Sequence, residues 1–117
     1  MSNTRFLEAL GGEKEIAITV KGRRTGRRYT KPVAFGVDAG KVYLLPTRGS
    51  NNDWYRNILV NPALRVKVGN RTFDVRAKAL TDRASVERVM DLIAAKYGKD
   101  HLERWYSVFD AAVEVAP

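Results

Sequence analysis

A basic stretch with two glycines contains the first residues whose types and spacing could do chemistry. From Lys21 to Lys31 it holds six basic residues, two glycines and two threonines, without an acidic residue. A turn whose backbone N–H groups converge between guanidinium groups is suited to holding a phosphate. The alternative is a basic hairpin that is exposed to water and binds nothing, since runs of charge are usually solvated.

A second polar segment, Pro46–Ser50, contains a glycine and leads into a predicted helix. Such a loop before a helix start directs backbone donors outward, and Arg48 adds positive charge. Asp53 counts slightly against an anion bound directly at that helix start. Trp54 and Tyr55 are neighbours on the helix and point in different directions, so we expect one to enter the core and the other to face a pocket.

The composition narrows the classes of protein and of site. A chain of 117 residues with 44% apolar residues fits a single domain with one core. It has no cysteine, which excludes disulfides, thiolate metal sites and cysteine nucleophiles. The lone histidine, His101, argues against a metal site or a Ser-His-Asp triad. No transmembrane segment or signal peptide is recognisable, so we expect a soluble, cytoplasmic protein without a metal.

Positive charge is concentrated in the middle of the chain. Between Ile16 and Leu80 there are 14 Lys and Arg against 3 Asp and Glu, a net charge of +11. The remainder has 7 against 10, a net charge of −3, and the two parts add to the formal +8. This asymmetry implies an anionic partner, and nucleic acid, an anionic membrane surface and a polyanionic small molecule all fit it.

The elements that must position these motifs are strands joined by tight turns. The pattern predicts strands over 16–20, 29–37 and 41–46, with turns at 22–26 and 38–40. Pro32 marks an edge position or a bulge in the second strand. Asp53 is the predicted cap of a short helix that carries Trp54, Tyr55, Ile58 and Leu59 and ends at Asn61–Pro62.

The second half of the chain continues with a hairpin, two helices and a strand. Leu64, Val66 and Val68, and then Phe73, Val75, Ala77 and Ala79, alternate with basic or polar residues, as in a hairpin with one solvated face. A helix with Thr81 as its cap runs to Gly98. A short helix with Leu102, Trp105, Tyr106 and Phe109 on one face follows, and then a last strand over 111–115.

The predicted order is therefore β-β-β-α-β-β-α-α-β, which suggests a small, mainly β barrel with helices packed outside it. We expect one domain over residues 1–117, with an N-terminal segment at 1–15, the barrel and the candidate motifs at 16–80, and the helices and last strand at 81–117. A parallel nucleotide-binding sheet does not fit, because tight turns join successive strands.

Several motifs, taken in order, resemble the deazaflavin-dependent nitroreductase and quinone reductase family. They are Gly-Arg-Arg-Thr-Gly-Arg at 22–27, Pro32, Thr-Arg-Gly-Ser at 47–50, Trp-Tyr-Arg-Asn at 54–57, Asn-Pro at 61–62 and the strand from Ala63 to Gly69. The resemblance covers residues 16 to 80, and beyond them it rests on the order of elements. It implies a split β-barrel, the FMN-binding fold of pyridoxamine-phosphate oxidases, with a cleft for the reduced deazaflavin coenzyme F-420.

The same resemblance implies which residues bind that coenzyme. The glycine turn is expected to hold its phosphate through Arg23, Arg24 and Thr25, and the second loop to contact the deazaflavin and its side chain through Thr47, Arg48 and Gly49. The full predicted set is Arg23, Arg24, Thr25, Gly26, Arg27, Pro32, Thr47, Arg48, Gly49, Ser50, Trp54 and Tyr55. Two departures weaken the match: the loop before Trp54 is short, and Tyr29 stands where many relatives have a basic residue.

The resemblance also implies hydride transfer to a small planar acceptor such as a quinone, a conjugated carbonyl or a nitro compound, with the hydride chemistry belonging to the cofactor. Thr47 is the predicted hydroxyl donor near the ring or the substrate, and Tyr97, Trp105 and Tyr106 are predicted walls of the substrate pocket. The alternative for these aromatics is ordinary core packing at helical spacing, and His101 is expected at the surface.

Three other readings stay open at this stage. FMN is the alternative cofactor, and a non-catalytic carrier of FMN, haem or a fatty acid would use the same barrel. A nucleic-acid-binding barrel is the rival from another class, but the basic residues gather in turns instead of alternating with exposed aromatics along a sheet face. A homodimer is compatible with the fold, since split barrels often pair through sheet surfaces.

Overall fold

The computed structural model describes residues 3–117. Its strands are β1 (Ile16–Lys21), β2 (Arg28–Val33), β3 (Phe35–Asp38), β4 (Lys41–Leu44), β5 (Ala63–Val68), β6 (Arg71–Leu80) and β7 (Ala112–Ala116). Its helices are α1 (Asn3–Leu10), α2 (Asp53–Val60), α3 (Arg83–Tyr97) and α4 (Lys99–Trp105), with a 3-10 turn, η1 (Gly49–Asn51), before α2. None of these helices has the length and hydrophobicity that a membrane span requires.

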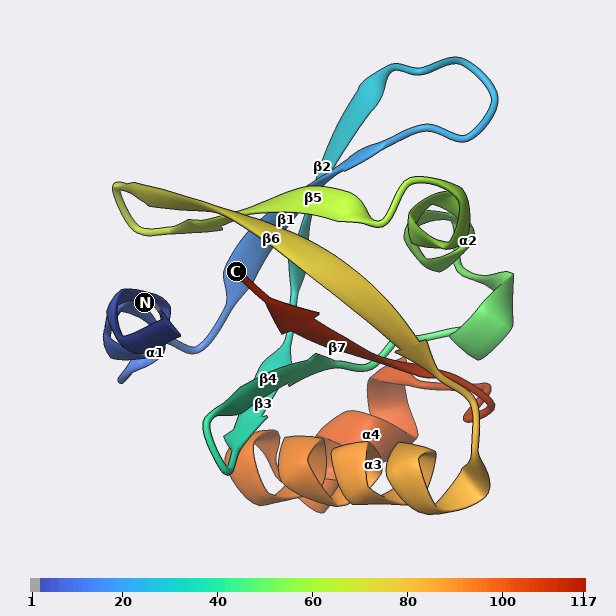
Figure 1. Ribbon diagram of the computed structural model, residues 1–117. Helices are drawn as coiled ribbons and strands as arrows, with labels where there is room; N and C mark the ends of the chain where they lie inside the picture. The colour runs from blue at the N-terminus through green and yellow to red at the C-terminus, as the bar shows by residue number, and fades with distance from the viewer. Residues whose placement is uncertain (1–2) are drawn as a thin grey trace.

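The strands form one antiparallel sheet of seven strands in the order β2-β1-β5-β6-β7-β4-β3 (Figure 1). The predicted strand over 29–37 is interrupted at Ala34, and its two halves, β2 and β3, lie at opposite ends of this order. Because only one residue separates these two edge strands, the sheet must curl until its ends meet. The result is the predicted split barrel, and Pro32 lies on an edge strand, as expected.

Alternation along the strands places one face of the sheet inside the barrel. In β5, Leu64, Val66 and Val68 are buried, whereas Ala63, Arg65 and Lys67 are exposed. The interior also receives Phe6 and Leu10 from α1, a helix that the sequence pattern did not predict. An isolated helix of eight residues is marginal in water, so these two apolar contacts, and not local propensity, account for its formation.

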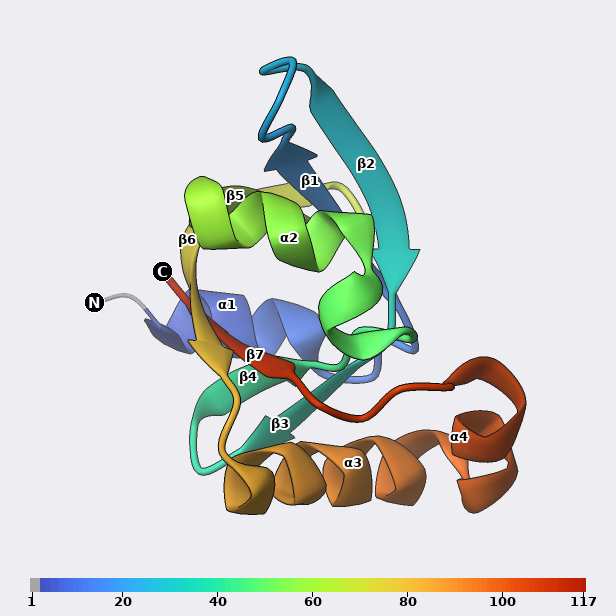
Figure 2. The same cartoon turned by 90° about the vertical axis from the view of Figure 1, so that its right-hand side faces the viewer.

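The longest helix, α3, covers the outer face of the sheet at the end formed by β3 and β4 (Figures 1 and 2). Val86, Val89 and Ile93 pack there against Tyr43 and Leu45 in a second apolar cluster. The outer face of β1, β2 and β5 has no helix over it (Figure 1). The barrel therefore has one covered and one open outer side.

Both predicted helix caps were wrong by one residue. The carboxylate of Asp82, not the hydroxyl of Thr81, caps α3 by accepting a hydrogen bond from the backbone N–H of Ser85 at 3.0 Å. In α2, Asp53 is the first helical residue and Asn52 occupies the cap position. The side chain of Asn52 turns back and accepts from the backbone N–H of Arg48, so it orders the preceding loop instead of capping the helix.

Candidate functional site

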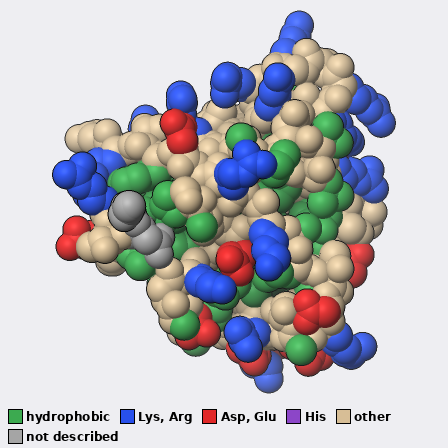
Figure 3. Space-filling model, in the orientation of Figure 1, with side chains coloured by type: hydrophobic (Ala, Val, Ile, Leu, Met, Phe, Trp, Pro, Cys, Tyr) green, Lys and Arg blue, Asp and Glu red, His purple; other side chains and the backbone are tan. Residues whose placement is uncertain are grey.

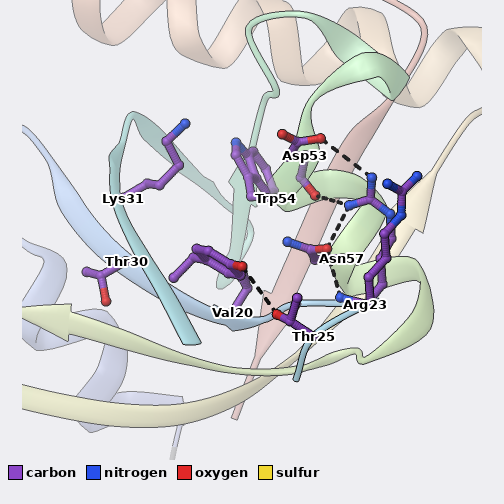
Figure 4. Close-up of a pocket in the computed structure, with 11 residues that line it drawn as sticks. Val20, Arg23, Thr25, Thr30, Lys31, Asp53, Trp54 and Asn57 are labelled. Atoms are coloured by element: carbon purple, nitrogen blue, oxygen red, sulfur yellow. Dashed lines mark hydrogen bonds and ion pairs between the residues drawn. The ribbon is translucent and has the colours of Figure 1, made fainter. Parts of the chain in front are cut away.

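The largest described pocket lies between the β1–β2 hairpin and the helix α2, and we call it the α2 pocket (Figure 4). Its volume is about 510 Å³, within the roughly 300–1,000 Å³ typical of sites for small molecules and cofactors. Its lining residues come from both elements: Val20, Gly22, Arg23, Arg24, Thr25, Tyr29, Thr30, Lys31, Asp53, Trp54 and Asn57.

The turn at one end of this pocket is closed by its own backbone. The N–H of Gly22 donates to the carbonyl of Arg27 at 2.7 Å, and the N–H of Gly26 donates to the carbonyl of Gly22 at 3.0 Å. Gly26 has φ +74°, a left-handed conformation that favours glycine. A Cβ added to Gly22 would lie 2.7 Å from the ring of Tyr29, so this ring covers the turn.

Arg23 attaches the turn to α2. Its backbone N–H and its guanidinium Nη1 both donate to the side-chain oxygen of Asn57, at 3.1 and 2.7 Å. Its Nη2 lies 3.5 Å from the carboxylate of Asp53, and the same guanidinium donates to the Asp53 carbonyl at 3.4 Å (Figure 4). We call these contacts the Arg23 latch. They use the donors of Arg23 within the protein, so this residue orders the turn more than it offers charge to a ligand.

Two other cations of the pocket are unpaired. Arg24 and Lys31 line it and are exposed, and the side chain of neither makes a hydrogen bond or ion pair with another residue of the described 3–117. Their charges face water unless an anion is bound. The pocket thus combines an ordered glycine turn, two free cations and the side chain of Trp54, a donor set suited to an anionic group attached to a planar ring.

Trp54 and Tyr55 are both buried in the core cluster inside the barrel, and of the two only Trp54 also lines the α2 pocket. Burial, with a smaller contribution from the nearby Asp110 carboxylate, raises the pKa of Tyr55 above its ordinary value. Tyr55 therefore keeps its proton at neutral pH and has no contact with the pocket.

The second predicted loop, residues 47–50, is held by a different part of the chain. The N–H and the hydroxyl of Ser50 donate to the two carboxylate oxygens of Asp110, at 2.8 and 2.6 Å. We call this pair the Asp110 latch, and its hydrogen bonds hold the pKa of Asp110 below its ordinary value. The carbonyl of Thr47 accepts from the N–H of Ser107 at 2.8 Å, so the segment before β7 orders the whole loop.

None of the four residues of this loop lines the α2 pocket, although the loop leads directly into α2. The hydroxyl of Thr47 donates to the side chain of Asn52 at 3.3 Å, so any contact with a substrate requires it to leave this partner. Gly49 has φ +54°, and a Cβ there would lie 2.1 Å from an oxygen of Asp110. Only glycine fits this position.

The remaining predicted residues also lie away from the α2 pocket. Pro32 pairs with Ala17 beyond its lining, and Gly26 and Arg27 belong to the turn but do not line it. Tyr97 closes the barrel by donating its hydroxyl to the Lys14 carbonyl and accepting from the N–H of Phe35.

Of the other two predicted substrate-pocket aromatics, one is buried and the other is exposed. Tyr106 lies in the second apolar cluster, under α3, where burial raises its pKa to about 12, and its ring is tilted against that of His101, which is partly buried. Trp105 is 62% exposed on α4. Neither residue lines the pocket, so the core-packing alternative describes Tyr106, whereas Trp105 faces solvent.

The residue that the sequence analysis missed is Asn57. It is only 6% exposed, yet it is polar and carries the Arg23 latch. The sequence contained a usable signal: Trp54, Asn57 and Ile58 are spaced i, i+3, i+4, which puts an amide on the buried face of the helix. A buried polar side chain needs a partner, and the nearby basic turn supplies it.

Comparisons with known proteins identify the family and the fold. A profile of the F-420H(2)-dependent quinone reductase family matches residues 2–111. A solved reductase dependent on reduced F-420 (FDR-A) is 19% identical, covers 89% of this chain and 95% of its own, and superposes with a TM-score of 0.68.

Two further solved structures share the fold. A pyridoxamine 5′-phosphate oxidase homologue from Listeria innocua is 14% identical over 98% of this chain and 92% of its own, with a TM-score of 0.71. Another, described as a domain-swapped dimer, is 18% identical over 97% and 93% of the two chains, with a TM-score of 0.68. With its family profile matched over nearly the whole length, the chain belongs to the F-420H(2)-dependent quinone reductases, oxidoreductases whose cofactor is the deazaflavin coenzyme F-420.

Proposed function

We propose that the α2 pocket binds reduced coenzyme F-420 and that the protein uses it to reduce a small planar acceptor, with quinones as the first class. The observation that carries this proposal is the ordered turn beside α2, which leaves Arg24 and Lys31 unpaired at a pocket with a tryptophan in its wall. The donor set fits an anionic coenzyme with a planar ring.

The charge of the pocket suits the phosphodiester and the polyglutamate tail of this coenzyme. Each exposed ion pair contributes only about 0.2–1 kcal/mol, so several must act together. Arg24 and Lys31 are the free cations in the pocket lining, and Arg27 lies next to them in the turn. We therefore expect the affinity to fall as salt is added, because exposed charges are screened.

The protein's part in the reaction is positioning and shielding. When bound, the reduced coenzyme supplies a hydride, and a quinone that takes the hydride and a proton from water becomes the hydroquinone. The Arg23 latch holds the phosphate-binding turn against α2, and Trp54 offers an apolar wall for a ring. Apart from Asp53, which is engaged by Arg23, the pocket lining has no acidic residue and no histidine, so we assign no protein group to proton transfer.

The test is titration of the purified protein with reduced F-420, oxidised F-420 and FMN, followed by fluorescence. We expect tighter binding of F-420 than of FMN, and a loss of about two- to fivefold in affinity for Arg24→Gln, the effect of one exposed ion pair. Arg104→Gln, an exposed arginine on α4, is the matched control and should bind as the unchanged protein does. Equal affinities for both variants would contradict the proposed site.

Activity is tested separately by following the oxidation of reduced F-420 with menadione, a conjugated enone and a nitroaromatic compound in turn. We expect the quinone to be reduced with the highest kcat/KM. Binding of F-420 without turnover of any of the three acceptors would support the pocket and overturn the acceptor class.

A further inference from the structure

The open outer side of the barrel has a hollow surrounded by arginines. It has a volume of about 310 Å³, and Arg28 of β2, Arg65 of β5 and Arg76 of β6 all line it. We call it the arginine hollow. The other residues around it are Ala63, Leu64, Asp74, Val75 and Pro117.

Strand register explains why these residues meet. Ala63 pairs with Arg76, and Lys21 pairs with Arg28. β1 pairs with β5 as far as Thr19 and Arg65. Arg28 of β2 and Arg76 of β6 therefore lie toward the same end of these strands, and both line the hollow together with the small side chain of Ala63.

The charge at the arginine hollow is only partly balanced. The Nε of Arg65 lies 3.1 Å from the carboxylate of Asp74 and donates to it. The side chains of Arg28 and Arg76 make no hydrogen bond or ion pair within residues 3–117. Among the side chains that line the hollow, three guanidinium groups stand against one carboxylate, so positive charge is in excess. In addition, Lys21 and Arg28 are directly opposite each other, a like-charge pair that costs stability when no anion lies near it.

We infer that the arginine hollow is a second anion-binding site that takes a phosphate monoester. Guanidinium groups bind phosphate oxygens in pairs, and a monoester carries close to two negative charges at neutral pH, which suits the excess of guanidinium groups around the hollow. A hollow of this size admits the phosphate together with a short organic group. Figure 3 shows Lys and Arg side chains spread over the side of the molecule where β5 and β6 run in Figure 1.

This site is separate from the α2 pocket. Arg28 and Tyr29 are consecutive in β2, and consecutive side chains of a strand point to opposite faces. Tyr29 lines the α2 pocket, whereas Arg28 lines the arginine hollow. The inference therefore does not depend on the proposed coenzyme site, and each site can be removed without changing the other.

The experiment is an NMR titration of the full chain with glycerol 3-phosphate, at constant ionic strength set with chloride. We expect the backbone amide signals of Ala63, Arg65 and Arg76 to move and to saturate. Sodium sulfate is the comparison anion. Linear, unsaturated shifts, or equal shifts with sulfate, would overturn the assignment of a phosphate monoester.

Variants locate the site. Arg28→Gln and Arg76→Gln should each weaken the binding by about two- to fivefold, and the double variant by roughly tenfold, because exposed charge pairs contribute little individually. Arg24→Gln, in the α2 pocket, and Arg88→Gln, on α3, should leave it unchanged. Loss of the shifts in Arg24→Gln, or their full retention in the double variant, would place the ligand elsewhere and overturn the inference.

The source of the phosphate is settled by co-sedimentation with vesicles of phosphatidylcholine, with and without phosphatidic acid, whose headgroup is a phosphate monoester. Binding to phosphatidic acid that is lost in the double variant would identify a lipid headgroup as the ligand. Saturable binding of glycerol 3-phosphate without vesicle binding would identify a soluble ligand. A single-stranded oligonucleotide that moves the same signals at lower concentration than the monoester would overturn the assignment in favour of nucleic acid.

Discussion

The two loops predicted to bind the coenzyme are ordered by the same device with different chemistry. In each, one side chain from elsewhere in the fold accepts two hydrogen bonds from a single loop residue. Asn57, a neutral and buried amide, accepts both donors of Arg23, whereas Asp110, an exposed carboxylate, accepts both donors of Ser50. The two hydrogen bonds to Asn57 in the Arg23 latch have a non-titratable acceptor, whereas both hydrogen bonds of the Asp110 latch depend on a carboxylate. The turn beside the pocket is therefore held mainly by contacts that do not change with pH.

The largest effect we expect is from Gly49→Ala in the Asp110-latched loop. The new Cβ would lie 2.1 Å from a carboxylate oxygen of Asp110 and would also strain a residue at φ +54°. Left-handed strain costs about 1–2 kcal/mol, and overpacking adds about 1–3 kcal/mol. The free energy of unfolding is measured by urea denaturation. Gly69→Ala is the matched control, since Gly69 has φ +59° with open space around it. Its unfolding free energy should decrease only by the contribution of the backbone strain. Equal losses would show that Asp110 does not confine the loop.

Asn57→Ala should come next, because it removes the acceptor of the Arg23 latch. It leaves a partly buried N–H and a guanidinium without their partner, which costs about 1–3 kcal/mol of unfolding free energy. The affinity for reduced F-420 should fall with it, since the turn is no longer held against α2. Asn57→Asp, which keeps an acceptor for Arg23, should restore most of both quantities. A variant Asn57→Ala with normal coenzyme affinity would show that the latch has no part in binding.

The acid response should distinguish the two latches further. Because the hydrogen bonds from Ser50 lower the folded-state pKa of Asp110 from its ordinary value of 3.8, the folded state binds the proton less well than the unfolded state. The stabilisation that Asp110 provides is complete at pH values above its pKa in the unfolded state. It is lost as the pH falls through its lower pKa in the folded state. Since Asp110 is exposed, we expect less than about 1 kcal/mol.

The measurement is urea denaturation of the unchanged protein and of Asp110→Asn at a series of pH values between neutral and strongly acidic. The difference in the free energy of unfolding between the two proteins should be largest at neutral pH and should decrease in acid. Asp82→Asn is a useful second variant, because the α3 cap also has a lowered pKa and should behave similarly without affecting the loop. A constant difference across the pH range would mean that the Asp110 carboxylate does not act through its charge.

The smallest effect on stability is expected from Arg24→Gln, because the side chain of Arg24 has no partner within the described residues. Substitutions of this kind usually change the unfolding free energy by no more than about 0.5 kcal/mol. Arg23→Gln, its neighbour, should cost clearly more because it breaks the latch to α2. The pair is compared by thermal denaturation without coenzyme. Equal stabilities would show that Arg23 is as free as Arg24.

The sequence predicted most accurately those features of the fold that depend on residues close together in the chain. The alternation at 64–68 and 73–79 predicted the β5–β6 hairpin, and both segments are strands whose predicted inward residues are buried or partly buried, except Ala79, which is exposed. The basic turn was recognised from its residues, and four of its members, Gly22, Arg23, Arg24 and Thr25, line the largest described pocket. The break at Ala34 was missed, because it depends on Tyr97, far along the chain, which binds the N–H of Phe35. Likewise, the Asp110 latch joins residues that are far apart in sequence.

Pro32 has a consequence for self-association that goes beyond its place in the fold. A strand at the edge of a sheet has unpaired backbone groups that invite a strand from another molecule, and such pairing leads to aggregation. Proline has no N–H to offer, and it is preceded in β2 by the exposed cations Arg28 and Lys31. This rim of the sheet thus carries its own protection against fibre-like growth, without a helix or loop to cover it.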